Sequence, residues 1–367
     1  MSEGIQPIRL TDEQRLDWLR LIRSQNVGPR TFRALLNHFG GARAALEALP
    51  GLARRGGGAS GPQICSREQA EREIEACAKL GISLVALVEA DYPQRLQMID
   101  DAPPLLAIRG HAGVLTMPFV AIVGSRNASA AGVKITERLT RALAQAGFAI
   151  ASGLARGIDA AGHRASVATG TVAVLAGGQD RVYPPEHVEL LDEILTTGSA
   201  VTEMPLGWEP RARDFPRRNR LISGLSLGVV IVEAAKRSGS LITARLALEQ
   251  GREVLRCRAL RSIRARSLIK QGATPVTEAD DIVSVLRPII GAELPAREPE
   301  IDKAEESPLD PAPDERARVI ALLSPTPVSL DDLIRLSRTS PRVVLLELEI
   351  AGRLERHGGG LVSLTNG

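Results

Sequence analysis

Short segments rich in glycine and serine follow four of the apolar runs in this sequence. They are 124–132, 152–159, 177–178 and 238–240. Glycine lets the backbone approach a ligand closely, and the first turn of a helix presents unpaired N–H groups with a partial positive charge. Several such turns at one edge of a sheet predict a site for phosphate groups. Ser129 and Ser240 could instead be plain N-caps.

The familiar phosphate and metal motifs are missing. The sequence contains neither GxGxxG nor GxxxxGK[ST], so neither a dinucleotide fingerprint nor a Walker A loop is present. Cys65, Cys77 and Cys257 are widely spaced, and the five histidines show no ligand spacing, which argues against a disulfide framework and a zinc site. We therefore expect no metal and no cofactor.

Positive charge is concentrated beside these loops. Residues 208–270 hold 15 Lys/Arg against 5 Asp/Glu, an excess of 10 in a chain whose formal net charge is +3. A row of cations suits a polymer backbone better than a single phosphate, although a solvated helix face would look the same. Aromatic residues make up only 2% of the chain, so binding should be mainly electrostatic. Tyr183 and Phe215 are expected to pack in the core.

The elements that must position these loops alternate between strand and helix. Apolar runs lie at 82–88, 119–123, 148–151, 171–176, 200–203, 228–233 and 253–255, and from 119 onward a helical pattern follows each run. This alternation predicts an α/β fold, a doubly wound Rossmann-like parallel sheet with helices on both faces, spanning 81–291. Ligands of such sheets bind beyond the carboxyl ends of the strands.

Smaller domains are expected at both ends. Residues 1–80 read as a helical domain of the SAM or helix-hairpin-helix type, whose Asn26-Val-Gly-Pro-Arg30 turn could hold a phosphate or serve packing alone. Residues 292–314 form an acidic, proline-rich linker. Residues 315–367 predict a winged helix. Its third helix, 340–352, carries Arg342 against Glu347 and Glu349, which favours contact with protein over duplex DNA.

The N-terminal residues are acidic and lack the apolar core of a signal peptide, and no run approaches the roughly 20 apolar residues of a membrane span. We therefore expect a cytoplasmic protein without a membrane partner.

Six blocks give the sequence a family resemblance. In order they are Gly124-Ser-Arg126, Ser152-Gly-x-Ala-x-Gly-Ile-Asp159, Tyr183-Pro184, Glu203-x-Pro205, Phe215-Pro-x-Arg-Asn-Arg220 and Ser238-Gly-Ser-Leu-Ile-Thr243. Together they resemble the signature of the DNA-processing protein A (DprA/Smf) family over about 120–290. The resemblance implies a protein that binds single-stranded DNA, forms a homodimer and loads the RecA recombinase in natural transformation, and it implies no catalysis.

The resemblance also implies a DNA-binding site. Arg126 would hold a backbone phosphate, and Asp159 would brace its helix. Asn219 and one of the neighbouring arginines could be structural. The implied DNA-binding residues are Gly124, Ser125, Arg126, Ser152, Gly153, Gly157, Gly177, Gly178, Arg217, Arg218, Arg220, Lys236, Ser238, Gly239, Ser240 and Thr243.

One stretch departs from the family. Leu255 to Arg266 replaces the expected Val-Pro-Gly turn and contains five of the 15 local Lys/Arg, and a compensated frameshift would explain it. Two other functions stay open. A nucleotide-hydrolysing enzyme of the lysine-decarboxylase-like type would use Glu203 and Glu233, but its PGGxGTxxE signature is absent. A nucleotide-sensing regulator would act through the winged helix.

Overall fold

The computed structural model describes residues 8–58, 61–234, 238–257, 272–290 and 311–365. Lys236 and residues 258–266 of the atypical stretch lie outside the described residues, as does most of the expected linker. The chain divides into two compact units. The first comprises Met1–Arg9 and Glu73–Ala296, and the second comprises Leu10–Arg72 and Arg297–Gly367.

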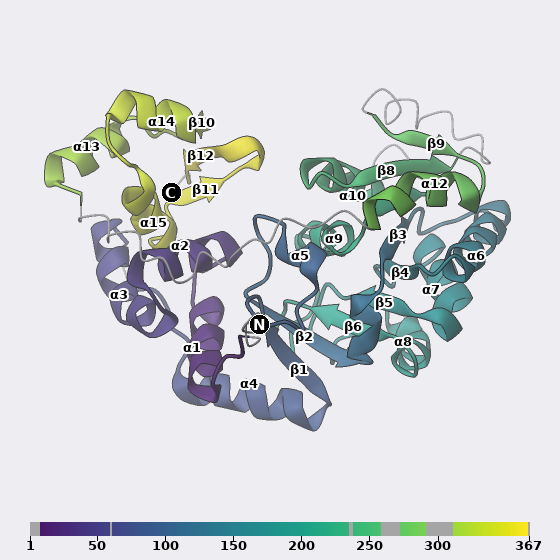
Figure 1. The fold of residues 1–367 in the computed structure, drawn as a ribbon. Coiled ribbons are helices and arrows are strands. Elements are labelled where there is room, and N and C mark those ends of the chain that lie inside the picture. Colours follow the sequence, from purple (N-terminus) through teal and green to yellow (C-terminus); the bar gives the residue numbers. More distant parts are fainter. Residues whose placement is uncertain (1–7, 59–60, 235–237, 258–271, 291–310, 366–367) are drawn as a thin grey trace, which may run out of the picture. The chain divides into compact units, whose positions relative to one another are not determined.

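A nine-stranded sheet forms the centre of the first unit (Figure 1). Its strand order is β1-β2-β6-β5-β4-β3-β7-β8-β9, and the seven strands from β6 to β9 in that order are parallel. β1 and β2 add an antiparallel edge. The predicted doubly wound α/β fold is confirmed. The bounds are β1 Ile82–Ala86, β2 Leu105–Gly110, β3 Phe119–Val123, β4 Ala149–Ser152, β5 Thr171–Val174, β6 Ser199–Thr202, β7 Gly228–Ile231, β8 Glu253–Cys257 and β9 Thr274–Val276.

Two of these strands were not predicted. β2 follows two prolines and pairs with β1 and β6 in the antiparallel sense, so it lies outside the strand–helix alternation. β9 has only three residues and contains Pro275, which an edge strand tolerates because one of its sides needs no ladder hydrogen bond.

Helices cover both faces of the sheet because successive strand residues point to opposite sides. In β3, Ala121 and Val123 pack with α5, α9 and α10, whereas Val120 and Ile122 pack with α6 and α12. A further cluster joins α7 and α8 to the second face. The bounds are α5 Gln94–Gln97, α6 Ala130–Gln145, α7 Ile158–Ser166, α8 Val188–Leu195, α9 Asp214–Leu225, α10 Gly239–Glu249 and α12 Ala279–Ile290. Short 3-10 turns are η1 Ala112–Thr116, η2 Val167–Thr169 and η3 Pro185–His187.

The second unit contains segments from both the N-terminal and the C-terminal parts of the chain. Its helical part contains α1 Asp12–Arg23, α2 Pro29–Phe39, α3 Ala42–Arg55 and the start of α4 Arg67–Lys79. The predicted winged helix is confirmed. It comprises α13 Pro313–Ala321, β10 Val328–Ser329, α14 Leu330–Ser337, α15 Arg342–Ile350, β11 Leu354–Arg356, η4 Gly358–Gly360 and β12 Leu361–Leu364, with the strand order β10-β12-β11.

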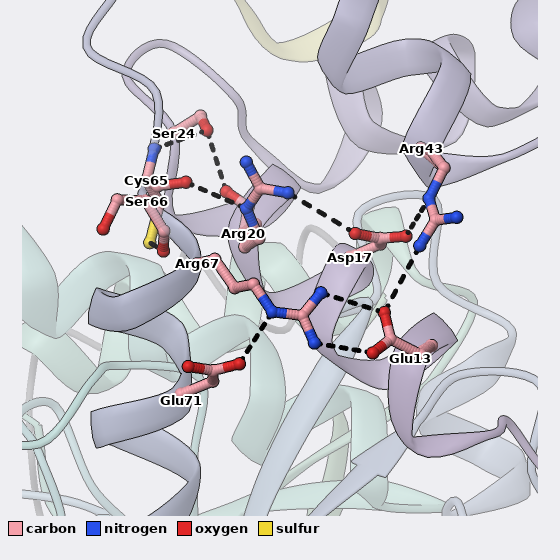
Figure 2. Close-up of polar contacts among 9 residues, drawn as sticks. All are labelled: Glu13, Asp17, Arg20, Ser24, Arg43, Cys65, Ser66, Arg67 and Glu71. Atoms are coloured by element: carbon pink, nitrogen blue, oxygen red, sulfur yellow. Dashed lines mark hydrogen bonds and ion pairs between the residues drawn. The ribbon is translucent and has the colours of Figure 1, made fainter.

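Ion pairs fasten the first turn of α4 to α1 (Figure 2). Arg67 donates to both Glu13 oxygens, at 2.6 and 3.1 Å, and to Glu71 at 2.7 Å. Arg43 of α3 contacts Glu13 and Asp17 at 3.3 and 3.2 Å. Single exposed pairs contribute little to stability, but one shared network fixes three helices together.

Among the described residues, no helix is long and apolar enough to span a bilayer. The same residues contain no cluster of His, Cys, Asp and Glu suited to a metal ion.

Candidate nucleic-acid interface

Loops beyond the carboxyl ends of β3, β4 and β5 surround a pocket of about 180 Å³ together with the start of α9. Its position agrees with the rule that parallel sheets bind ligands at this edge. The lining residues are Arg126, Asn127, Gly153, Ala155, Arg156, Tyr183, Pro184, Phe215 and Arg218.

A stack of aromatic and guanidinium groups forms one wall of this pocket. The Arg126 guanidinium lies 5.2 Å from the centre of the Phe215 ring. The Tyr183 ring meets the Phe215 ring edge-on, with centroids 5.3 Å apart. Tyr183 is 48% exposed, so the expectation that it packs in the core is wrong. It lies in a loop next to Pro184, between β5 and α8.

Two glycines hold the Arg126 loop against the start of α7. Gly157 has φ +73°, and a Cβ there would lie 2.3 Å from the Ser125 carbonyl oxygen. Ile158 N–H donates to the same oxygen at 3.2 Å. A Cβ on Gly124 would lie 2.5 Å from Ile158 Cγ1. The glycines therefore allow close contact between two loops of the protein itself, and that contact positions Arg126.

The loop after β4 uses its amide groups internally. Gly153 N–H and Ala155 N–H donate to Asp159 Oδ2, at 3.1 and 3.4 Å. Burial raises the pKa of Asp159, while the positive charge of Arg218 acts in the opposite direction. Asp159 therefore braces the loop after β4 through these two amide groups. The hydroxyl of Ser152 is fully buried and donates to Ile122 O at 2.6 Å.

Gly177 and Gly178 are buried against residues 205–210. A Cβ on Gly178 would lie 2.4 Å from Pro205 O, and Gly178 N–H donates to Trp208 O at 3.0 Å. Here too the absence of a side chain on the glycines lets two backbone segments approach each other closely.

The three predicted arginines of α9 differ in burial. Arg218 is 5% exposed and donates through Nη1 to Gly153 O and Val174 O, both at 2.5 Å. Burial lowers the pKa of Arg218 to about 10. Arg220 is equally buried and donates to Glu203 at 2.5 Å. Arg217 is exposed and donates to Glu203 at 2.9 Å. Only Arg217 of the three reaches the surface.

The start of α10 is organised by its own capping bonds. Ser238 is the N-cap and accepts from Ser240 N–H at 3.3 Å, so Ser240 is not the cap. Thr243 is buried and donates to Gly239 O at 3.3 Å, and Asn219 donates to the same oxygen at 3.3 Å. Asn219 is thus a structural hydrogen-bonding residue, as expected.

A carboxylate occupies the N-terminus of α6. Glu233 Oε2 accepts from the N–H and the hydroxyl of Ser129, each at 3.1 Å, and Ser129 also caps the helix by accepting from Gly132 N–H at 3.0 Å. The positive end of a helix dipole favours an anion, and here the protein supplies that anion itself. The sequence showed Ser129 as a possible cap but gave no sign of its pairing with Glu233, a residue 104 positions away.

Sequence reasoning left several lining residues out of the site. Arg156 is exposed, lines the pocket and forms an ion pair with Glu186, which raises the pKa of Arg156. Its place between Ser152 and Gly157 in a signature block was the available signal. Asn127, in the loop after β3, and Ala155, in the loop after β4, also line the pocket.

Three family models match the chain. "DNA recombination-mediator protein A" covers residues 83–287, "DprA-like N-terminal HHH domain" covers 12–76, and "DprA winged helix domain" covers 303–360. The chain belongs to the DNA recombination-mediator protein A family. The resemblance inferred from the six sequence blocks is thereby confirmed.

Individual members of this family agree with the assignment. Protein Smf of Escherichia coli K12 is 40% identical over 296 residues, which cover 76% of this chain and 77% of the relative. DNA processing protein DprA of Bacillus subtilis 168 is 40% identical over 222 residues, covering 59% and 75%.

Two solved structures are also similar. The X-ray structure of DNA processing protein A from Streptococcus pneumoniae has a TM-score of 0.54 and 35% identity, covering 60% of this chain and 80% of that one. The Helicobacter pylori protein, described as having a unique single-stranded DNA binding mode, has a TM-score of 0.52 and 26% identity, covering 57% and 96%.

Proposed function

We propose that this protein is a recombination mediator that binds single-stranded DNA at the pocket between Arg126, Tyr183 and Phe215. The observation that carries this proposal is the pocket wall in which the exposed Arg126 guanidinium lies over the Phe215 ring and the exposed Tyr183 ring meets Phe215 edge-on. Arginine binds backbone phosphates, and exposed aromatic rings stack on unpaired bases of any sequence. This combination suits a single strand, because the bases of a duplex are stacked on one another.

The burial of the predicted residues narrows the DNA-contacting set. Arg126, Arg156 and Arg217 offer exposed cations, and Tyr183 offers a ring face. Arg218, Arg220 and Ser152 are buried and donate hydrogen bonds inside the protein. Gly124 and Gly157 allow the close loop contact that positions Arg126. Ser125 follows β3, and Ser238 and Gly239 form the start of α10 after β7. These three residues lie at the same sheet edge and complete the proposed surface.

Fluorescence anisotropy of a labelled oligothymidylate tests this assignment. We expect the wild-type protein to bind the single strand more tightly than a duplex of equal length, and Arg126→Ala to lower that affinity about tenfold. Arg141→Ala is a matched control. It removes an equally exposed cation roughly 16 Å along α6 from the helix N-terminus and should bind normally. Equal binding by Arg126→Ala and wild type would reject the pocket.

We further propose that the protein acts as a homodimer that loads RecA onto single-stranded DNA during natural transformation, as family membership suggests. Filament assembly by RecA on DNA covered with single-strand-binding protein would measure this role. A DNA-binding-competent protein that leaves the assembly rate unchanged would contradict it.

The proposed role involves no catalysis. The two strand-end acids that an enzyme would need are both engaged with protein groups, Glu203 with Arg217 and Arg220 and Glu233 with Ser129. Incubation with nucleoside monophosphates should therefore release neither base nor phosphate. Turnover that disappears in Glu203→Gln would favour the hydrolase alternative.

A further inference from the structure

The winged helix buries its third helix, α15, against the N-terminal helical domain. α15 is the helix that a duplex-reading winged helix would place in the major groove. Seven of its nine residues are buried, which exceeds what one face of a surface helix requires. α15 packs on the winged-helix core through Val344, Leu345 and Leu348, and it also contacts α2 and α3 of the N-terminal part.

A buried carboxylate joins the two domains. Glu347 of α15 is 1% exposed, and Arg316 of α13 binds both its oxygens at 2.9 Å. Arg55, at the end of α3, donates to Glu347 Oε1 at 2.5 Å from the other domain. Glu347 therefore has one partner within the winged helix and a second partner in the N-terminal domain. The acidic residue that disfavours DNA on this helix serves as an anchor between domains.

The fit around Gly56 shows how closely α15 approaches α3. A Cβ on Gly56 would lie 2.1 Å from Glu347 O and 2.8 Å from Ala351 Cβ. Arg353 donates to Gly56 O at 3.0 Å. Gly56 has φ −72° and ψ −4°, which any residue adopts, so its own backbone conformation does not require glycine. The close contact with α15 is what requires glycine at position 56.

The hairpin turn of the N-terminal domain takes part in the same contact. Asn26 Nδ2 donates at 3.0 Å to Ile350 O, at the C-terminal end of α15. This turn was the segment whose amide groups could hold a phosphate. One side chain of the turn thus contacts the end of α15, while Asn26 and Arg30 are themselves exposed.

We propose that α15 is a protein-docking helix whose partner is the N-terminal helical domain of the same chain, and that this docking closes α15 to duplex DNA. The inference is independent of the proposed pocket, which lies in the other unit. It assigns the winged helix a structural role, in which α15 binds the N-terminal helical domain.

Hydrogen-exchange mass spectrometry on the full chain tests the proposal. Gly56→Ala adds one methyl group where α15 lies, while Gly51→Ala adds one on the same helix where only the end of Arg55 lies within 4 Å, at 3.6 Å. We expect Gly56→Ala to speed exchange at least about tenfold in 342–350 and at the end of α3, and Gly51→Ala to speed exchange in neither segment. A folded Gly56→Ala protein with wild-type exchange would overturn the proposal.

A second variant covers the case in which Gly56→Ala fails to fold. Arg55→Ala removes the interdomain partner of Glu347 but leaves Arg316 in place, so the winged helix keeps its internal ion pair. Faster exchange in 342–350 with unchanged exchange in β11 and β12 supports docking, and unchanged exchange throughout contradicts it. Adding duplex DNA to the wild-type protein should not slow exchange in 342–350; if it does, α15 reads DNA and the proposal fails.

Discussion

Arg218 provides the sharpest test of the distinction between pocket-shaping and DNA-contacting arginines. Its guanidinium is buried beneath the pocket, donates to the carbonyls of Gly153 and Val174, and lies near the Asp159 carboxylate. Arg218→Ala would leave two buried carbonyl oxygens without these donors and Asp159 without its cation. We therefore expect the variant to lower the stability of the first unit more than its DNA affinity.

The magnitude follows from opposing contributions. An unsatisfied buried acceptor costs about 1–3 kcal/mol, so the two carbonyls together cost about 2–6 kcal/mol. The lowering of the Arg218 pKa from 12.5 to about 10 means that burying the charged group costs about 3 kcal/mol at neutral pH, which the substitution recovers. Truncating this buried side chain also removes its packing and leaves a cavity, which adds a further penalty of a few kcal/mol. The net loss should be about 3 kcal/mol, or roughly 6–12 °C in Tm for a unit of this size.

Thermal and urea unfolding, followed alongside oligothymidylate binding, measure both quantities. Arg217→Ala is the control, because it removes the adjacent exposed arginine while Arg220 still pairs with Glu203. That variant should lose at most about 1 kcal/mol of stability and should bind DNA more weakly. An Arg218→Ala protein of wild-type Tm that has lost DNA binding would refute the reasoning and make Arg218 a direct DNA ligand.

Three further predictions concern buried, exposed and glycine positions. Burial lowers the pKa of His163 to about 3, so the unfolded state gains a proton below pH 6.5 that the folded state does not. Stability should therefore fall by about 2 kcal/mol between pH 7.5 and pH 5 in urea titrations, and His163→Gln should flatten that dependence; an identical slope in the variant would contradict this. Tyr183→Ala should lower single-strand affinity by about 1–3 kcal/mol in anisotropy titrations while Tyr183→Phe binds normally, and equal loss in both would argue against stacking. Gly157→Ala should cost about 2–4 kcal/mol in urea unfolding and weaken DNA binding, because the methyl group meets Ser125 O and the residue has positive φ. Gly113→Ala, with open space around it in η1, should do neither, and matching losses in the two variants would show that the close contact is unimportant.

The sequence was most informative about the sheet. Seven apolar runs alternating with helices correspond to β1 and to β3 through β8, because strands covered on both faces are nearly continuous in hydrophobic residues. β2 and β9 escaped prediction because the first lies outside the repeating unit and the second has three residues with a central proline.

Side-chain burial at the site could not be predicted in the same way. Arg217, Arg218 and Arg220 look alike in the sequence, yet their positions around α9 send one to solvent and two beneath the loops. Counting charge overstated the number of cations available to DNA, since the guanidinium groups of Arg218 and Arg220 are buried and donate to backbone carbonyls and to Glu203.

Long-range pairs were equally beyond the reach of the sequence. Glu233 and Ser129 are 104 residues apart, and Asn26 and Ile350 are 324 residues apart. Neither local pattern nor spacing encodes such pairs, so the α6 carboxylate cap and the docking of α15 became visible only in the fold.

The central claim is that an exposed arginine–aromatic pocket binds the backbone of single-stranded DNA, and the salt dependence of binding tests it most directly. The observed association constant of wild type and Arg126→Ala for oligothymidylate should be measured across a series of salt concentrations. If Arg126 holds one phosphate, the slope of log K against log salt should be about 0.7 less steep in the variant. Identical slopes and affinities for the two proteins would show that Arg126 contacts no phosphate and that the DNA lies elsewhere.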